Sequence, residues 1–169
     1  MIQVVPAVAA LLIGFAAVAA GNGLLHSLLG LRLGLAGLTP LAIGAVLSCY
    51  FFGFILATIS GHRVVERAGH IRSFAAFAAL CSVSALLHAV SDEVLVWALL
   101  RALTGYSAAG MFMVTESWLN ARAGNETRGR VLSLYMVTVY AAVGGGQFFL
   151  KLADPAGFEL FVLVSVLLT

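Results

Sequence analysis

Polar side chains inside otherwise apolar stretches are the residues of this sequence best suited to bind a solute. Arg101 is the clearest of them, and it lies with Gly105 and Glu116 in the apolar stretch 94–119. A charged residue at the centre of a membrane-spanning helix costs about 2.5 to 3.5 kcal/mol on insertion scales, so Arg101 should face protein or water. Residues 101, 105, 108, 112 and 116 share one face of a helix. We expect that face to point inward and to line a polar cavity.

Each of the two charges on this face also has a second interpretation. Arg101 lies four residues after Trp97, so its long side chain would also fit near a membrane surface, where it would snorkel or pair structurally. Glu116 lies two residues before Trp118. We expect Glu116 to form a salt bridge with arginines of the following loop, and the alternative is a carboxylate that carries protons.

Two more apolar stretches carry polar residues that would suit a cavity. Asn22 stands between two glycines, which weaken a helix locally, so the position is either a hinge that exposes Asn22 or an asparagine that is hydrogen-bonded between packed helices. Tyr140, Gly144 and Gln147 recur at the spacing i, i+4 and i+7 on one helix face. That face would line a cavity, or its glycines would form a helix-packing surface.

The spans hold no arrangement that is typical of catalysis or metal binding. They contain neither a GxSG-type nucleophile motif nor a clustered pair of acids, and the four histidines lack the spacing of metal ligands. Cys49 and Cys81 each lie midway along an apolar run, where a free cysteine packs as a small hydrophobic residue. We therefore expect no enzyme, no cofactor and no metal site.

The composition indicates which solvent surrounds these residues. Hydrophobic residues make up 62% of the chain and charged residues 9%, with a mean hydropathy of +1.09, so a soluble domain would leave most of its surface apolar. The net charge of +2 is too small to suggest a nucleic-acid partner. We expect an all-α, polytopic membrane protein whose partner is the lipid bilayer.

Apolar stretches of about twenty residues are the elements that must position the polar side chains. Five are complete, and a sixth is incomplete: residues 4–29, 41–60, 73–90, 94–119, 131–150 and 157–169. Ten residues counted from Leu160 rise only about 15 Å along a helix. We therefore expect residues 1–169 to form one transmembrane bundle whose sixth helix is truncated, as in a fragment of a longer chain.

Local signals predict where these helices begin and how they sit in the membrane. A residue that favours the N-cap precedes a proline or an acid at Thr39-Pro40, Ser91-Asp92 and Asp154-Pro155, which predicts three helix starts. Trp97 and Trp118 lie 21 residues apart, or about 31 Å along a helix. That spacing predicts one aromatic residue at each membrane interface.

The distribution of basic residues predicts the orientation. Loops near 61–72 and 120–130 fall on one side of the membrane and contain six arginines, whereas the loops of the other side hold Arg32 and Lys151. Short loops rich in arginine and lysine stay in the cytoplasm. We expect a multi-pass protein of the cytoplasmic (inner) membrane with a cytoplasmic N-terminus. The six arginines are Arg63, Arg67, Arg72, Arg122, Arg128 and Arg130.

Three sequence patterns resemble a known family. The segment 61–73, GHRVVERAGHIRS, resembles the signature G-x-L-a-D-R-x-G-R-R between helices two and three of the major facilitator superfamily. Its corresponding residues are Gly61, Glu66, Arg67, Gly69 and Arg72, with Glu66 in place of aspartate. RALTG, residues 101–105, resembles the R-x-x-x-G element of helix four, and ESWLNARAGNETRGRVLSLYM resembles the exit from helix four into helix five. The longer phrases are most similar to the YcaD-like bacterial branch.

The resemblance implies a fold and a function. It implies the N-terminal six-helix bundle of a twelve-helix secondary active transporter, which moves a small solute by alternating access and is coupled to protons or another ion. The implied partners are a small-molecule substrate, protons and a C-terminal six-helix half that lies outside this sequence. Arg101 would take part in proton coupling or organise the cavity. The alternative is a membrane subunit or assembly scaffold that transports nothing.

For the signature segment we hypothesise a conformational latch. Glu66 and Arg67 would pair with the charged loop between helices four and five, or with the second half, in one access state and release it in the other. The charged residues of that loop are Arg122, Glu126, Arg128 and Arg130.

Overall fold

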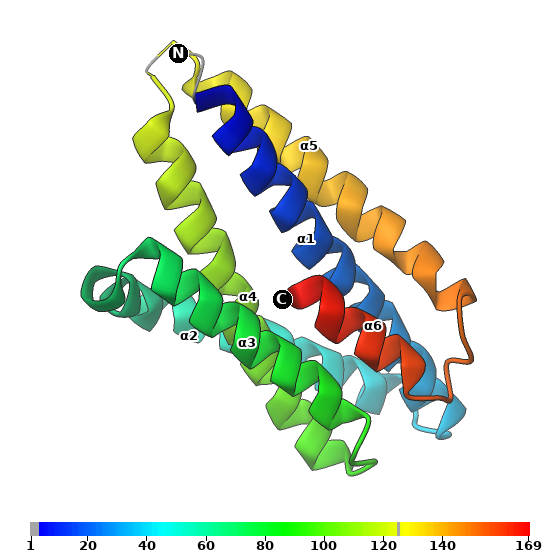
Figure 1. The fold of residues 1–169 in the computed structure, drawn as a ribbon. Helices are drawn as coiled ribbons and strands as arrows, with labels where there is room; N and C mark the ends of the chain where they lie inside the picture. Colours follow the sequence, from blue (N-terminus) through cyan, green and yellow to red (C-terminus); the bar gives the residue numbers. More distant parts are fainter. Residues whose placement is uncertain (1–3, 125) are drawn as a thin grey trace.

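The described residues of the computed structural model, 4–124 and 126–169, form a bundle of α-helices (Figure 1). They contain no β-strand, and five of the helices are long and apolar enough to cross a membrane. The predicted all-α, polytopic class is therefore confirmed. In chain order the elements are α1 (Val4–Leu35), α2 (Pro40–Ala68), α3 (His70–His88), α4 (Val94–Arg122), α5 (Arg128–Gly146), the 3-10 helix η1 (Gln147–Lys151) and α6 (Glu159–Leu168).

The helices pack as two groups that α6 joins. Helix α4 packs against α2 and α3, and α5 runs beside α1 (Figure 1). Helix α6 lies between α1 and α3 and contacts both of them. Leucines of α1 and the apolar face of α6 are fully buried and form the centre of the core: Leu24, Leu25, Leu28, Leu29, Leu160, Phe161, Val164 and Leu168.

Glycines let the backbones of α2 and α4 approach very closely. A Cβ atom on Gly53 would overlap the carbonyl group of Ala102, and one on Gly105 would overlap the carbonyl group of Tyr50. Small residues allow such contact between membrane helices, where packing and not the hydrophobic effect drives association. The contact brings the middle of α2 directly against the turn of α4 that contains Arg101.

The signature segment is helical where a loop is predicted. Helix α2 continues to Ala68 and α3 begins at His70, so Gly69 alone separates them. Gly69 adopts φ +79°, and its N–H donates to the carbonyl of Val65 at 2.9 Å. Glycine tolerates this backbone conformation, which other residues rarely adopt. The loop prediction is wrong because the length of an apolar run indicates only the part of a helix that crosses the hydrocarbon layer. Here α2 and α3 continue past that layer through turns that carry charged residues.

One of the three predicted helix starts is confirmed. Thr39 caps α2, and its Oγ1 accepts a hydrogen bond from the Ala42 N–H at 3.3 Å. The other two are wrong, since α4 begins at Val94 and α6 at Glu159. Ser91 accepts instead from the Glu93 N–H, and Asp154 from the Ala156 N–H. Both side chains form local turns, for which serine and aspartate are as well suited as for N-caps.

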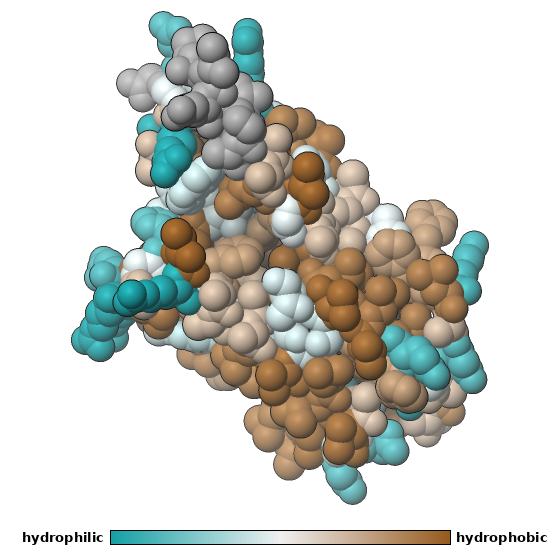
Figure 2. Space-filling model, viewed as in Figure 1, coloured by the Kyte–Doolittle hydropathy of each residue, from teal (hydrophilic) through white to brown (hydrophobic). Residues whose placement is uncertain are grey.

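The outer surface is largely apolar. Figure 2 shows hydrophobic side chains over the middle of the visible face and hydrophilic side chains toward its edges. Exposed residues of α2 include Phe51, Phe52, Ile55 and Ile59, as expected for a helix that faces lipid or another apolar partner. The spacing predicts that Trp97 lies at a membrane interface, but its side chain is only 4% exposed and donates to the carbonyl of Ser91 within the bundle.

We predict that Gly53→Ala destabilises the bundle. The added Cβ must displace the backbone of α4 at Ala102, and overpacking of this kind typically costs about 1 to 3 kcal/mol. Gly44→Ala on the same helix is the matched control, because no atom lies within 4 Å of its Cβ position. Thermal unfolding in detergent should show a lower Tm for Gly53→Ala alone, and equal values for the two variants would contradict the close contact.

Candidate functional site

A cavity of about 780 Å³ lies between α1, α2, α4 and α5. A smaller cavity of about 170 Å³ adjoins it and shares the lining residues Asn22, Tyr50, Phe51 and Val143. The larger volume lies in the usual range for small-molecule sites. The other residues that line it are Phe54, Thr58, Ala109, Phe112, Met113, Glu116, Met136, Val139 and Tyr140.

The structure brings together the polar residues that the sequence places in separate stretches. Asn22, Glu116 and Tyr140 line the larger cavity, and Gln147 lines the smaller one. Arg101 lies behind the wall of the smaller cavity, in contact with two of its lining residues, His26 and Tyr50. Four helices, α1, α2, α4 and α5, thus contribute polar side chains to the walls of one continuous region.

Arg101 is fully buried in the bundle. Its Nη2 donates to Nδ1 of His26 at 2.9 Å, and its Cζ lies 4.7 Å from the centre of the Tyr50 ring. Its Nε and Nη1 atoms have no hydrogen-bond partner among the described residues. The guanidinium does not snorkel; it is paired inside the bundle with His26 and with the ring of Tyr50.

Two other contacts complete what we call the Arg101 cluster, which consists of Asn22, His26, Tyr50 and Arg101. Asn22 Nδ2 donates to the Tyr50 hydroxyl at 3.2 Å. Asn22 and His26 lie one turn apart on α1, so they share one face of that helix. A guanidinium donates and never accepts, so Nδ1 of His26 must be the acceptor and must carry no proton. The cluster therefore combines one fixed cation with three neutral polar side chains.

The glycines around the cluster explain how its members come together. Gly105 lies one turn after Arg101 and seats the backbone of Tyr50, which places the Tyr50 ring beside the guanidinium. On α1, a Cβ on Gly23 would overlap the carbonyl of Val143 in α5, and one on Gly21 would contact Leu167 of α6 at 3.0 Å. The glycines that flank Asn22 are therefore helix-packing positions.

Tyr140 and Gly144 of α5 share one helix face with Gln147, the first residue of η1. Tyr140 and Gln147 are exposed and line the two cavities, whereas no atom lies within 4 Å of a Cβ placed on Gly144. Packing falls on Gly146, where a Cβ would overlap the carbonyl of Ala20 in α1. Cavity lining and packing against α1 therefore meet at Val143, which lines both cavities and whose carbonyl lies against Gly23.

Sequence reasoning missed His26 and Tyr50. His26 follows Asn22 at the helical spacing i, i+4, which is a signal that both line one surface. Tyr50 is a polar aromatic residue in the middle of a span, three residues before Gly53. Its neighbour on α4 depends on how the two helices cross, which spacing along either helix does not determine.

Glu116 opens into the larger cavity far from Arg101. The two residues lie fifteen positions apart on α4, or about 22 Å along the helix axis, so they do not form an ion pair with each other. The expected salt bridge between Glu116 and arginines of the next loop is not formed among the described residues. Glu116 is exposed, and its backbone oxygen accepts from Asn120 at 2.9 Å.

The signature segment and the loop between α4 and α5 lie at the same end of the bundle. Glu66, Arg67 and Arg72 are exposed. His70 Nε2 and Ser117 Oγ of α4 lie within hydrogen-bond distance, 3.1 Å apart, so the signature segment contacts the last turns of α4. Among the described residues, the proposed latch partners form no hydrogen bond or ion pair with Glu66 or Arg67: Arg122 lies over the Trp118 ring, and Glu126, Arg128 and Arg130 are exposed. Gly61 is buried inside α2, against Met113.

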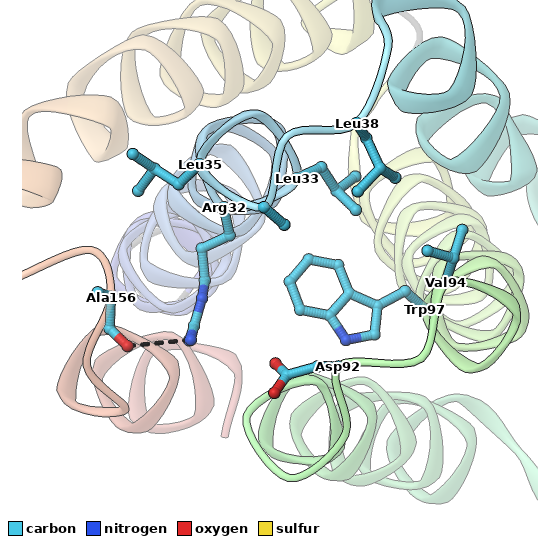
Figure 3. A pocket seen from close by; sticks show the side chains of 9 residues that line it. Arg32, Leu33, Leu35, Leu38, Asp92, Val94, Trp97 and Ala156 are labelled. Carbon is cyan, nitrogen blue, oxygen red and sulfur yellow. Dashed lines mark hydrogen bonds between the residues drawn. The ribbon is translucent and has the colours of Figure 1, made fainter.

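A separate pocket of about 260 Å³ lies at the other end of the bundle (Figure 3). Arg32 lines it together with Asp92 and Trp97. The guanidinium of Arg32 donates to the carbonyls of Ala156 at 2.9 Å and Gly157 at 3.1 Å, and it lies over the ring of Phe161. These contacts tie the last turns of α1 to the segment that leads into α6, so Arg32 has a structural role.

We predict that Arg101→Met raises the stability of the protein. Replacing buried ion pairs by apolar side chains is often neutral or stabilising by about 1 to 4 kcal/mol, and a buried charge without an opposite charge has no Coulombic attraction to lose. Arg63→Met is the control, since Arg63 is exposed on α2. Thermal unfolding in detergent without added solute should show an increased Tm for Arg101→Met only. A fall of several degrees would instead make Arg101 a structural residue.

Comparison with known proteins agrees with this helical arrangement. The chain is 28% identical over 137 residues to the uncharacterised MFS-type transporter YcaD of Salmonella arizonae, and 30% identical over 141 residues to an uncharacterised MFS-type transporter of Enterobacter sp. (strain 638). Each match covers 81% of the chain and 36% of the relative, so the chain spans about a third of the length of these relatives. No protein-family model and no solved structure matches it. The chain belongs to the major facilitator superfamily and is similar to its YcaD members.

Proposed function

We propose that the chain forms one half of a secondary active transporter that moves a small solute across the cytoplasmic membrane by alternating access. The observation that carries this proposal is the convergence of polar residues from α1, α2, α4 and α5 on one cavity within the membrane-spanning region. Polar and charged residues are expensive inside a bilayer and mark pathways for solutes or ions. Similarity to MFS-type transporters supports the same function.

The proposal includes a second six-helix half that closes the cavity. Exposed apolar side chains of α2 and α5 flank the cavity on this chain, among them Phe51 and Val137. Transporters of this architecture hold their solute between two repeats that rock against each other. A second bundle placed against α2 and α5 would supply the opposite wall.

The proposal also includes an orientation and a latch. The arginine-rich end, with Glu66 and Arg67, would face the cytoplasm. These exposed side chains at the α2–α3 junction would contact either the charged residues between α4 and α5 or the second half in one access state. Breaking such contacts would favour the other state.

Protons are the coupling ion that we propose. His26 and Glu116 are titratable groups that line the cavities. Arg101 already donates to Nδ1 of His26, so a proton on that atom would break the hydrogen bond and bring two positive charges together. Proton binding would therefore alter the contacts of Arg101, which is what coupling requires.

Cysteine labelling of the full gene product tests alternating access without knowledge of the solute. Thr58→Cys and Met136→Cys line the cavity, and both would be made after replacement of Cys49 and Cys81. We expect a membrane-impermeant thiol reagent to label each of them in right-side-out vesicles and in inside-out vesicles. Leu95→Cys is the control, and the reagent should not label it from both sides, because this side chain is 72% exposed on α4 but lines neither cavity.

Labelling from a single side would contradict alternating access and favour the alternative of a non-transporting membrane subunit or scaffold. A pH gradient across the vesicle should change the ratio of labelling from the two sides. An unchanged ratio would remove protons as the coupling ion.

The same labelling tests the latch. Loss of one contact worth about 1.4 kcal/mol changes an equilibrium constant tenfold, so we expect Glu66→Gln to change the two-sided labelling ratio of Thr58→Cys several-fold. Glu93→Gln, an exposed acid at the other end of the bundle, should leave the ratio unchanged. Equal ratios for both variants at normal expression would show that Glu66 holds neither access state.

A further inference from the structure

We propose that the solute carries a single negatively charged oxygen group, such as a carboxylate, and that the Arg101 cluster binds this group. The inference rests on the proposed transport function and names the chemical class of the solute. It follows from three observations: the charge that lacks a partner, the excess of hydrogen-bond donors, and the apolar remainder of the cavity.

Among the described residues, no acidic side chain forms an ion pair with Arg101 inside the bundle. The other members of its cluster are an amide, an imidazole that must be unprotonated at Nδ1, and a phenol. Glu116 lies about 22 Å away along α4. The remaining acids of the chain lie at helix ends or between helices: Glu66, Asp92, Glu93, Glu126, Asp154 and Glu159. A fully buried guanidinium in this setting requires an anion to balance it.

The cluster also offers more donors than acceptors. Nε and Nη1 of Arg101 are unpartnered among the described residues. Tyr50 accepts from Asn22, so the hydrogen of its own hydroxyl is available to a guest. His26 accepts at Nδ1, so the neutral ring carries its proton on Nε2, and it lines the smaller cavity. Carboxylate and phosphate oxygens are the groups that match such a set of donors.

The route from the cavity to Arg101 passes two side chains. His26 and Tyr50 line the smaller cavity and contact the guanidinium from the other side. Rotation of the Tyr50 ring breaks the one hydrogen bond that its hydroxyl forms with Asn22. An anion can accept from the Tyr50 hydroxyl while that bond is still formed, and rotation of the ring would then open the way to Nε or Nη1 of Arg101.

The rest of the cavity selects an apolar body. Phe54, Phe112, Met113 and Val139 line the larger space beyond the cluster. No lysine or arginine is among the described residues that line this space, so a second negative group in the same molecule would find no positive charge to balance it. The expected solute is therefore an organic monoanion with an apolar or aromatic body.

Binding of 2-naphthoate to the detergent-solubilised full gene product tests this proposal. Ligands that bind the folded state raise the Tm, so 2-naphthoate should raise it by several degrees, whereas 2-naphthylmethanol and 2-naphthylmethylamine should not. In Arg101→Gln the Kd for 2-naphthoate should increase at least tenfold. Tyr50→Phe should weaken binding less, and Arg63→Gln should behave as the unmodified protein.

Two results would overturn the proposal. In the first, 2-naphthoate changes the Tm no more than the alcohol does, which would assign the counterion of Arg101 to a carboxylate of the protein. In the second, Arg101→Gln binds 2-naphthoate with unchanged Kd. If Arg101→Gln fails to fold, the double variant with Arg101→Lys and Tyr50→Phe takes its place, and an unchanged Kd has the same meaning. Binding does not depend on transport, so two-sided cysteine labelling without naphthoate binding would remove this inference and leave the proposed function intact.

Discussion

The buried positive charge of Arg101 is the constraint around which the candidate binding site is arranged. A guanidinium without an opposite charge is among the most expensive groups to place in an apolar interior. Here it is held by a hydrogen bond to His26 and by the face of the Tyr50 ring. Those contacts offset part of its desolvation and leave two of its nitrogens unpartnered among the described residues. A site that keeps such a charge without pairing it is suited to bind a guest.

Close helix contacts make this arrangement possible. Gly53 and Gly105 let α2 and α4 touch through their backbones, and Gly23 and Gly146 do the same for α1 and α5. These two rigid pairs carry the members of the Arg101 cluster and most of the cavity wall. Helix α6 fills the space between α1 and α3 with apolar side chains. Packing thus fixes the walls, and the polar residues remain at the cavity between them.

Much of the fold follows from the sequence alone. Hydrophobic length predicts five membrane-spanning helices and their order, and Thr39 before Pro40 predicts where α2 begins. Helix ends are less predictable: Ser91 and Asp154 form turns, and α2 runs through charged residues to Gly69. The polar residues Arg101, Asn22, Tyr140 and Gln147 are visible as exceptions in apolar stretches. The sequence does not show that His26 and Tyr50 lie beside Arg101, because these contacts depend on how α1 and α2 cross α4.

The most direct measurement of the central claim is the contact between the guanidinium and an anion. Solid-state NMR would use the full gene product with ¹⁵N-labelled arginine in lipid, together with 2-naphthoate labelled with ¹³C in its carboxylate. The account predicts dipolar dephasing from a hydrogen-bonded contact, with nitrogen and oxygen about 2.8 Å apart, and its loss in Arg101→Gln. Dephasing that is absent, or that persists in Arg101→Gln, would contradict the account.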